Sequence, residues 1–107
     1  MDLLGSFLRK LRKEKGLPIR KVAAEIDVDQ STWGKYERGE RIPPKEVLPN
    51  IAAYYGIDEK ELRRNWLSER VLEPIKDEVE PEEILEIAKD KLKIVITQKQ
   101  KQGSLDF

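Results

Sequence analysis

The sequence contains no cysteine and no histidine among its 107 residues. Without cysteine the chain can form neither disulfide bonds nor thiolate metal sites. Without histidine it lacks the commonest general base and the commonest metal ligand, so a zinc site would have to consist of carboxylates alone. The adjacent carboxylates Glu82 and Glu83 lie in an acidic run that is typical of a solvated helix start. We therefore expect no metal, no other cofactor and no enzymatic activity.

A long apolar run is also missing. No segment approaches the roughly 20 apolar residues that a transmembrane helix needs. The first residues of the chain are interrupted by Asp2, Gly5 and Ser6 and then become basic, unlike the apolar core of a signal peptide. We therefore expect a cytoplasmic protein without a membrane partner.

An excess of either charge is absent from the chain as a whole, because 21 Lys and Arg residues balance 21 Asp and Glu residues. The charges are nevertheless unevenly distributed. Residues 1–45 hold 11 basic and 7 acidic residues, a net charge of +4, whereas residues 46–107 hold 10 basic and 14 acidic residues, a net charge of −4. This asymmetry points to a polyanionic partner; the alternative is that both halves are ordinary solvated surface.

Apolar residues at helical spacing are plentiful, and they define segments that glycine and proline residues separate. The segments cover residues 3–15, 18–27, 29–38, 47–55, 59–72 and 81–96. Asp29 and Asp58 precede two of them and are predicted to cap their first turns. We predict an all-α fold with a five-helix domain in residues 1–72. Residues 73–107 are predicted to form an acidic linker, a C-terminal helix and a flexible tail, although the β-branched run 94–97 leaves a short strand as an alternative.

The second and third segments carry the clearest functional signal. They are short and are joined by a tight turn at residues 27–29, which is typical of a helix-turn-helix. In that motif the second helix enters the major groove of DNA and the first crosses the DNA backbone. Gln30, Ser31 and Lys35 are side chains that can hydrogen-bond to base edges, and Gly34 would let the helix lie close to a base pair. Helical spacing alone favours a plain solvated face here, whereas the surrounding motif favours DNA contact.

Several short groups of residues between positions 8 and 62 form one combined pattern. They are Leu11-Arg12, Gly16-Leu17, Val22-Ala23-Ala24-Glu25, Asp29-Gln30-Ser31-Thr32, Glu37-Arg38-Gly39, Leu48, Ile51-Ala52 and Tyr55-Gly56-Ile57. The pattern covers about half of the chain and resembles the Cro/repressor-type helix-turn-helix family, also called the XRE family. The resemblance implies a five-helix repressor-like domain with a C-terminal helical extension.

The resemblance also implies roles for individual positions. The family's base-facing positions are occupied by Gln30, Ser31, Gly34 and Lys35. Its phosphate-contacting positions are occupied by Arg38, Arg41 and Lys45. Arg12 and Glu37 correspond to a partly buried structural pair that ties the first helix to the third.

The start of the second helix departs from the family pattern. The family commonly has Ser or Thr followed by a Gln that clamps a phosphate, and this chain has Pro18 and Ile19 at those positions. We expect Arg20 or Lys21 to supply the phosphate contact instead, or the contact to be missing.

A homodimer is expected because a single recognition helix touches only a few base pairs, while a two-fold pair reads a palindromic operator. Trp33 and Tyr36 share a face away from the reading residues and are expected in the core. The apolar residues of the fifth segment are assigned to the dimer interface, with an intramolecular core as the alternative for the group. These residues are Leu62, Trp66, Leu67 and Val71.

The function that the sequence favours is a sequence-specific, repressor-like transcriptional regulator that binds double-stranded DNA as a homodimer at the nucleoid. The alternative is a protein-interaction module or antitoxin that retains the helix-turn-helix fold and binds a basic partner through the acidic segment 73–90. The whole chain, including the stretch 64–68 and the acidic C-terminal helix, is similar to small bacterial regulators of restriction–modification systems. Phage and toxin–antitoxin regulators remain alternatives.

Overall fold

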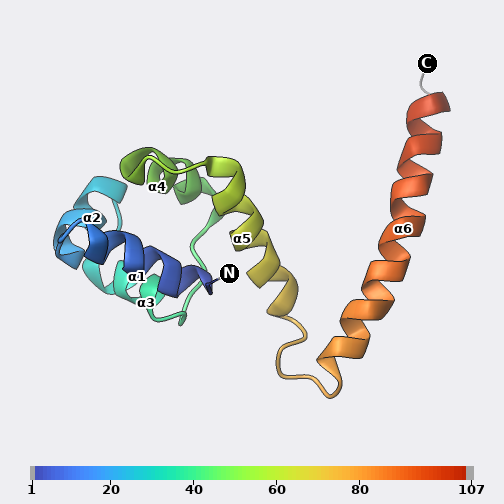
Figure 1. Ribbon diagram of the computed structural model, residues 1–107, viewed down its shortest axis with the longest axis horizontal. Helices are drawn as coiled ribbons and strands as arrows, with labels where there is room; N and C mark the ends of the chain where they lie inside the picture. Colours follow the sequence, from blue (N-terminus) through green and yellow to red (C-terminus); the bar gives the residue numbers. More distant parts are fainter. Residues whose placement is uncertain (1, 106–107) are drawn as a thin grey trace. The chain divides into compact units, whose positions relative to one another are not determined.

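All regular structure in the part of the chain that the computed structural model describes, residues 2–105, is helical (Figure 1). The elements are α1 (Leu4–Glu14), α2 (Ile19–Ile26), α3 (Gln30–Glu37), the short 3-10 helix η1 (Lys45–Val47), α4 (Leu48–Tyr55), α5 (Glu59–Leu72) and α6 (Pro81–Leu105). The prediction of an all-α fold is confirmed. None of the helices in this described range combines the length and the apolar composition that a membrane span requires.

The chain divides into two compact units, Met1–Leu72 and Glu73–Phe107. The first unit contains α1 to α5, and its helices pack in the pairs α1 with α3, α2 with α3, α2 with α4, α4 with α5, and α1 with α5. The second unit consists of a turn-rich segment followed by α6.

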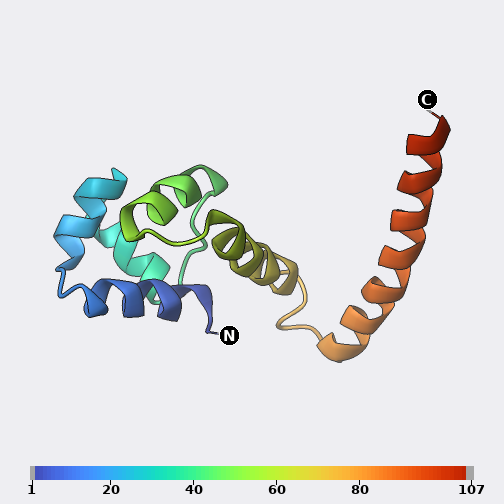
Figure 2. The same ribbon diagram turned by 45° about the horizontal axis from the view of Figure 1, so that its top comes forward.

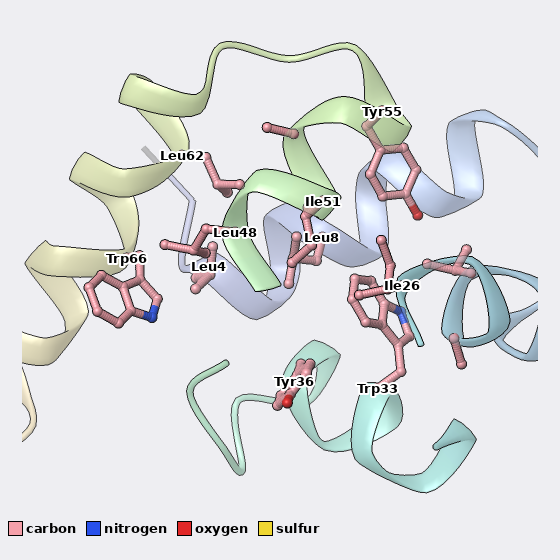
Figure 3. Packing of buried hydrophobic residues seen from close by; sticks show 13 residues of the cluster. Leu4, Leu8, Ile26, Trp33, Tyr36, Leu48, Ile51, Tyr55, Leu62 and Trp66 are labelled. Carbon is pink, nitrogen blue, oxygen red and sulfur yellow. The ribbon is translucent and has the colours of Figure 1, made fainter. Parts of the chain in front are cut away.

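One apolar core holds the first unit together. Figure 3 shows its side chains pointing from all five helices toward a common interior. The buried members are Leu4, Leu8, Val22, Ala23, Ile26, Trp33, Tyr36, Leu48, Ile51, Ala52, Tyr55, Leu62 and Trp66. They recur at helical spacing within each segment, which is why periodicity could identify the helices.

The helix ends follow the local chemistry of the sequence. Pro18 occupies the N-cap of α2, Pro49 lies in the first turn of α4, and neither position requires a backbone N–H donor. The Asp58 carboxylate accepts a hydrogen bond of 2.9 Å from the backbone N–H of Lys60, so the predicted cap of α5 is confirmed. The predicted cap of α3 is wrong, because the exposed Asp29 side chain makes no capping hydrogen bond although its backbone is extended at the N-cap.

The structure corrects the interpretation of α5. Leu62 and Trp66 are only 2% and 5% exposed, because this face of α5 packs against the core of the first unit. The Trp66 indole N–H donates a 2.6 Å hydrogen bond to the carbonyl of Pro43. Leu67 and Val71 point elsewhere and are 42% and 56% exposed, so of the four residues assigned to a dimer interface only these two are accessible.

The second unit differs from the expectation at its C-terminal end. The sequence predicts a helix that ends near residue 96 and a flexible tail after it, whereas α6 continues to Leu105. Residues 94–97, the alternative strand, are helical. The physical reason is the lysine- and glutamine-rich composition of residues 98–102, because both side chains are good helix formers and none of these residues is a proline or glycine.

Candidate nucleic-acid interface

The turn between α2 and α3 fixes their relative orientation. Asp27 takes a left-handed conformation with φ of 63°, which Asp tolerates better than most non-glycine residues. The backbone N–H groups of Asp27 and Val28 then donate back to the carbonyls of Ala24 and Ala23, at 3.2 and 2.9 Å. The chain reverses within residues 27–29, and α2 (light blue) and α3 (teal) pack against each other in a helix-turn-helix (Figures 1 and 2).

Helix α3 has one buried face and one exposed face. Trp33 and Tyr36 are buried and contact each other edge to face, with ring centroids 5.9 Å apart at an interplanar angle of 74°. This confirms their assignment to the core. Gln30, Ser31 and Lys35 are exposed on the rest of the helix, so their polar groups are accessible to a partner.

The sequence predicts that Gly34 faces the bases of DNA, and the structure does not support this position. The residue is buried, and a Cβ carbon built on it would come within 2.9 Å of an Arg38 guanidinium nitrogen. The Arg38 side chain therefore lies over Gly34, one turn back along α3. In this arrangement Gly34 makes room for Arg38 and is not itself open to a base.

Arg38 also forms an ion pair on this surface. Its guanidinium lies 3.0 Å from a carboxylate oxygen of Glu40, and both side chains are more than half exposed. The hydrogen bond lowers the pKa of Glu40 and raises the pKa of Arg38. Because both groups are solvated, a DNA phosphate can compete with Glu40 for the guanidinium at little cost.

The C-terminal turn of α3 is also held by a buried carboxylate. Glu37 accepts two hydrogen bonds from the Arg12 guanidinium, at 2.7 and 2.9 Å, and a third from the Trp33 indole N–H at 2.6 Å. Arg12 also donates to the carbonyl of Leu17 at 2.9 Å. The hydrogen bonds to Glu37 raise the pKa of Arg12 against the opposing effect of burial.

This arrangement contains the Arg12–Glu37 pair that the family resemblance implies, and it adds the bond from Trp33. The signal for that bond was present in the sequence, since Trp33 and Glu37 are four residues apart and therefore neighbours on one helix face. The three groups join α1 to α3 and so set the position of the exposed face of α3.

A second contact between α1 and α3 was not predicted from the sequence. A Cβ carbon on Gly5 would lie 2.5 Å from the Tyr36 carbonyl oxygen and 2.7 Å from that of Glu37. Only glycine allows the backbones of the two helices to approach this closely. The only sign of this contact in the sequence was a glycine, which disfavours a helix, inside a segment of helical apolar spacing. The close packing of α1 against α3 explains that glycine.

The residues expected to contact phosphates are all on the surface of the first unit. They are Arg20, Lys21, Arg38, Arg41 and Lys45. Arg20 and Lys21 lie in the first turn of α2, directly after Pro18 and Ile19. Pro18 has no backbone N–H to offer a phosphate, whereas the exposed side chains that follow it are cationic.

Comparison with known proteins identifies the family to which the chain belongs. Residues 3–66, more than half of the chain, match the helix-turn-helix domain family. The chain therefore belongs to that family, and the resemblance to the XRE type is confirmed.

Two of the similar proteins share about a third of their aligned residues with this chain. The cryptic phage CTXphi transcriptional repressor RstR of Vibrio cholerae is 35% identical over 60 residues, which cover 56% of this chain and 54% of the repressor. The chain thus matches about half the length of this curated relative. The restriction-modification controller protein C.AhdI from Aeromonas hydrophila is 34% identical, and its crystal structure superposes with a TM-score of 0.51 over 55% of this chain and 89% of the controller.

A third similarity supports the fold alone. The clp gene regulator ClgR from C. glutamicum is 24% identical, with a TM-score of 0.51 over 63% of this chain and 87% of the regulator. The names of these relatives describe regulators, which agrees with the expectation that the chain is not an enzyme.

Proposed function

We propose that this protein is a repressor-like transcriptional regulator that inserts α3 into the major groove of a specific DNA sequence. The observation that carries the proposal is the two-faced character of α3. Its aromatic face is locked in the core by Trp33 and Tyr36, while Gln30, Ser31 and Lys35 remain exposed on a rigid helix. The family membership and the names of the repressor and controller relatives support the same function.

The exposed residues of α3 suit base edges of different kinds. Gln30 can pair with the adenine N6 and N7 atoms, Lys35 can donate to the guanine O6 and N7 acceptors, and Ser31 can contact either. The surrounding cations then position the helix by binding phosphates, which carry no sequence information. Arg20 and Lys21 serve this role from α2, and Arg41 and Lys45 serve it from the loop region after α3.

The direct test is to select duplexes from a random pool and to measure the binding of variants to the selected site. Lys35→Ala is expected to weaken binding by about 1–3 kcal/mol and to relax specificity at one base position. Lys60→Ala is the matched control, because it removes the same charge from the exposed surface of α5. Arg41→Ala should weaken binding to all sequences alike and reduce the slope of affinity against salt by roughly one unit.

Two outcomes would contradict this function. If Lys35→Ala and Lys60→Ala bound the selected site equally well, α3 would not be the reading helix. If the wild-type protein bound no duplex even at low salt, the helix-turn-helix would serve as a scaffold and the protein-interaction alternative would be favoured.

The proposal includes a homodimer that uses the exposed face of α5. Leu67 and Val71 are one turn apart and form an apolar pair that the core of their own chain does not cover. An isologous contact through this pair would place two α3 helices about a two-fold axis, as a palindromic operator requires. Sedimentation should show self-association that Leu67→Asp with Val71→Asp weakens without unfolding the chain. A wild-type monomer well above micromolar concentration would contradict the dimer.

A further inference from the structure

Helix α6 exposes most of its apolar side chains. Ile87, Leu92, Ile94, Val95 and Ile96 are each between 44% and 59% exposed. The helix is 25 residues long, and several of its residues are β-branched, which lowers the stability of a helix without packing partners. A helix of this composition needs a surface that covers its apolar face.

Four of its apolar residues form a regular seam. Leu85, Ala88, Leu92 and Val95 follow one another at spacings of three, four and three residues. These are coiled-coil spacings, and they place the four side chains on one side of α6. The order of these spacings is the same from either end of the helix. The four positions are therefore symmetric about residue 90. A second copy of the helix, run antiparallel, therefore presents the same seam in register.

The charges on α6 are segregated along its length. Residues 82–90 carry four acidic residues and one lysine, whereas residues 91–101 carry four lysines and no acidic residue. An antiparallel copy sets each acidic half beside a basic half. A parallel copy would set four lysines beside four lysines, and this repulsion disfavours that orientation. The charge distribution of α6 is thus complementary to that of an antiparallel copy of the same helix.

We propose that the apolar face of α6 is covered by α6 of a second copy of this chain, in an antiparallel pair centred at Asp90. In this register Leu85 lies opposite Val95, and Ala88 lies opposite Leu92. Each small residue then faces a large one, whereas parallel pairing would leave a gap between two Ala88 side chains. The contact is isologous and closes on itself as a dimer. It concerns residues 81–101 alone and does not depend on DNA binding.

Cysteine cross-linking tests the pair and its orientation in the full chain, which contains no natural cysteine. Leu85→Cys and Val95→Cys are made as separate variants, one with a tag that changes its mass. In the antiparallel pair, residue 85 faces residue 95 of the other copy, and identical positions are offset by about 15 Å along the helix axis. A disulfide needs Cα atoms within about 7 Å. A disulfide-linked dimer is therefore expected in the oxidised mixture of the two variants and in neither variant alone.

The other outcomes overturn the proposal. Cross-linking within each single variant would show parallel pairing, and no cross-link in any combination would show that α6 is not paired with a second copy in this register. Circular dichroism of each variant verifies that helix content is kept. Binding of the same variants to the selected duplex is measured separately, so a failure here is distinguished from a failure of the proposed DNA reading.

A charge-reversal pair gives an independent measurement. One variant carries Glu82→Lys, Glu83→Lys and Glu86→Lys; the other carries Lys93→Glu, Lys99→Glu and Lys101→Glu. Each alone should weaken self-association through α6 by at least about tenfold, because like charges then face each other along the pair. Mixing the two should restore association. Failure of the mixture to associate better than either variant would overturn the electrostatic complementarity.

Discussion

The packing of α1 against α3 predicts opposite effects for the same substitution at two glycines. Gly5 and Gly34 both lie inside helices, where replacing glycine by alanine ordinarily stabilises a protein by about 0.5–1 kcal/mol. The space beyond the two residues differs. Gly5 faces two backbone carbonyls of α3, and Gly34 faces the far end of the Arg38 side chain.

This difference sets the magnitudes. At Gly5 the added carbon would lie 2.5 Å from the Tyr36 carbonyl oxygen, and a backbone atom cannot swing away. Helix α1 must then move from α3, and overpacking of this kind costs about 1–3 kcal/mol. After the gain in helix propensity is subtracted, Gly5→Ala should lower the free energy of unfolding by roughly 1 kcal/mol, and by about 2.5 kcal/mol at most. Gly34→Ala should raise it by about 0.5–1 kcal/mol, because the exposed Arg38 side chain moves aside.

Urea denaturation followed by tryptophan fluorescence measures both effects, since Trp33 and Trp66 are buried in the same core. The denaturant slopes of the two variants should match that of the wild type, so that the midpoints report stability directly. If Gly5→Ala were as stable as the wild type, or if both variants shifted in the same direction, the close approach of α1 to α3 would be refuted.

Three further predictions concern charged and buried groups. Arg12→Met should lower the free energy of unfolding by about 3–5 kcal/mol in the same urea assay, because it leaves the Glu37 carboxylate, 4% exposed, without its counter-charge. Glu40→Gln should tighten DNA binding severalfold in a low-salt gel shift, because it frees Arg38 for a phosphate; equal affinities would contradict a DNA contact by Arg38. Burial raises the pKa of Tyr55 to about 12 from 10.0, so the unfolded state loses this proton first and stability should fall as the pH rises from about 10 to 12. Tyr55→Phe should reduce that alkaline loss and cost little at neutral pH, because the buried hydroxyl has no hydrogen-bond partner among the described residues; an unchanged alkaline transition would contradict the shift.

The features of the fold that follow from local chemistry were predictable from the sequence. Apolar spacing located the five helices of the first unit, and it separated the buried Trp33 and Tyr36 from the exposed Gln30 and Lys35. Periodicity succeeds at these positions because each helix buries one face against a single core.

The features that depend on which helices are neighbours were not predictable in the same way. An apolar face on α5 has the same spacing whether it meets its own chain or a second copy, so Leu62 and Trp66 were assigned to the wrong surface. The burial of Gly34 depends on the rotamer of Arg38, and the role of Gly5 depends on how closely α3 approaches α1. Each of these is a contact between side chains or backbones that no periodic pattern encodes.

The structure separates the residues that position α3 from those that we propose read DNA. Arg12, Glu37 and Gly5 fix the helix through buried contacts with its C-terminal turn, and they contribute to stability. Gln30 and Lys35 are exposed, and substitutions at such positions usually change stability by no more than about 0.5 kcal/mol. Sequence preference can therefore change through the exposed face while the buried contacts keep α3 in place. A change in the buried contacts would instead alter stability and the geometry of the whole reading surface together.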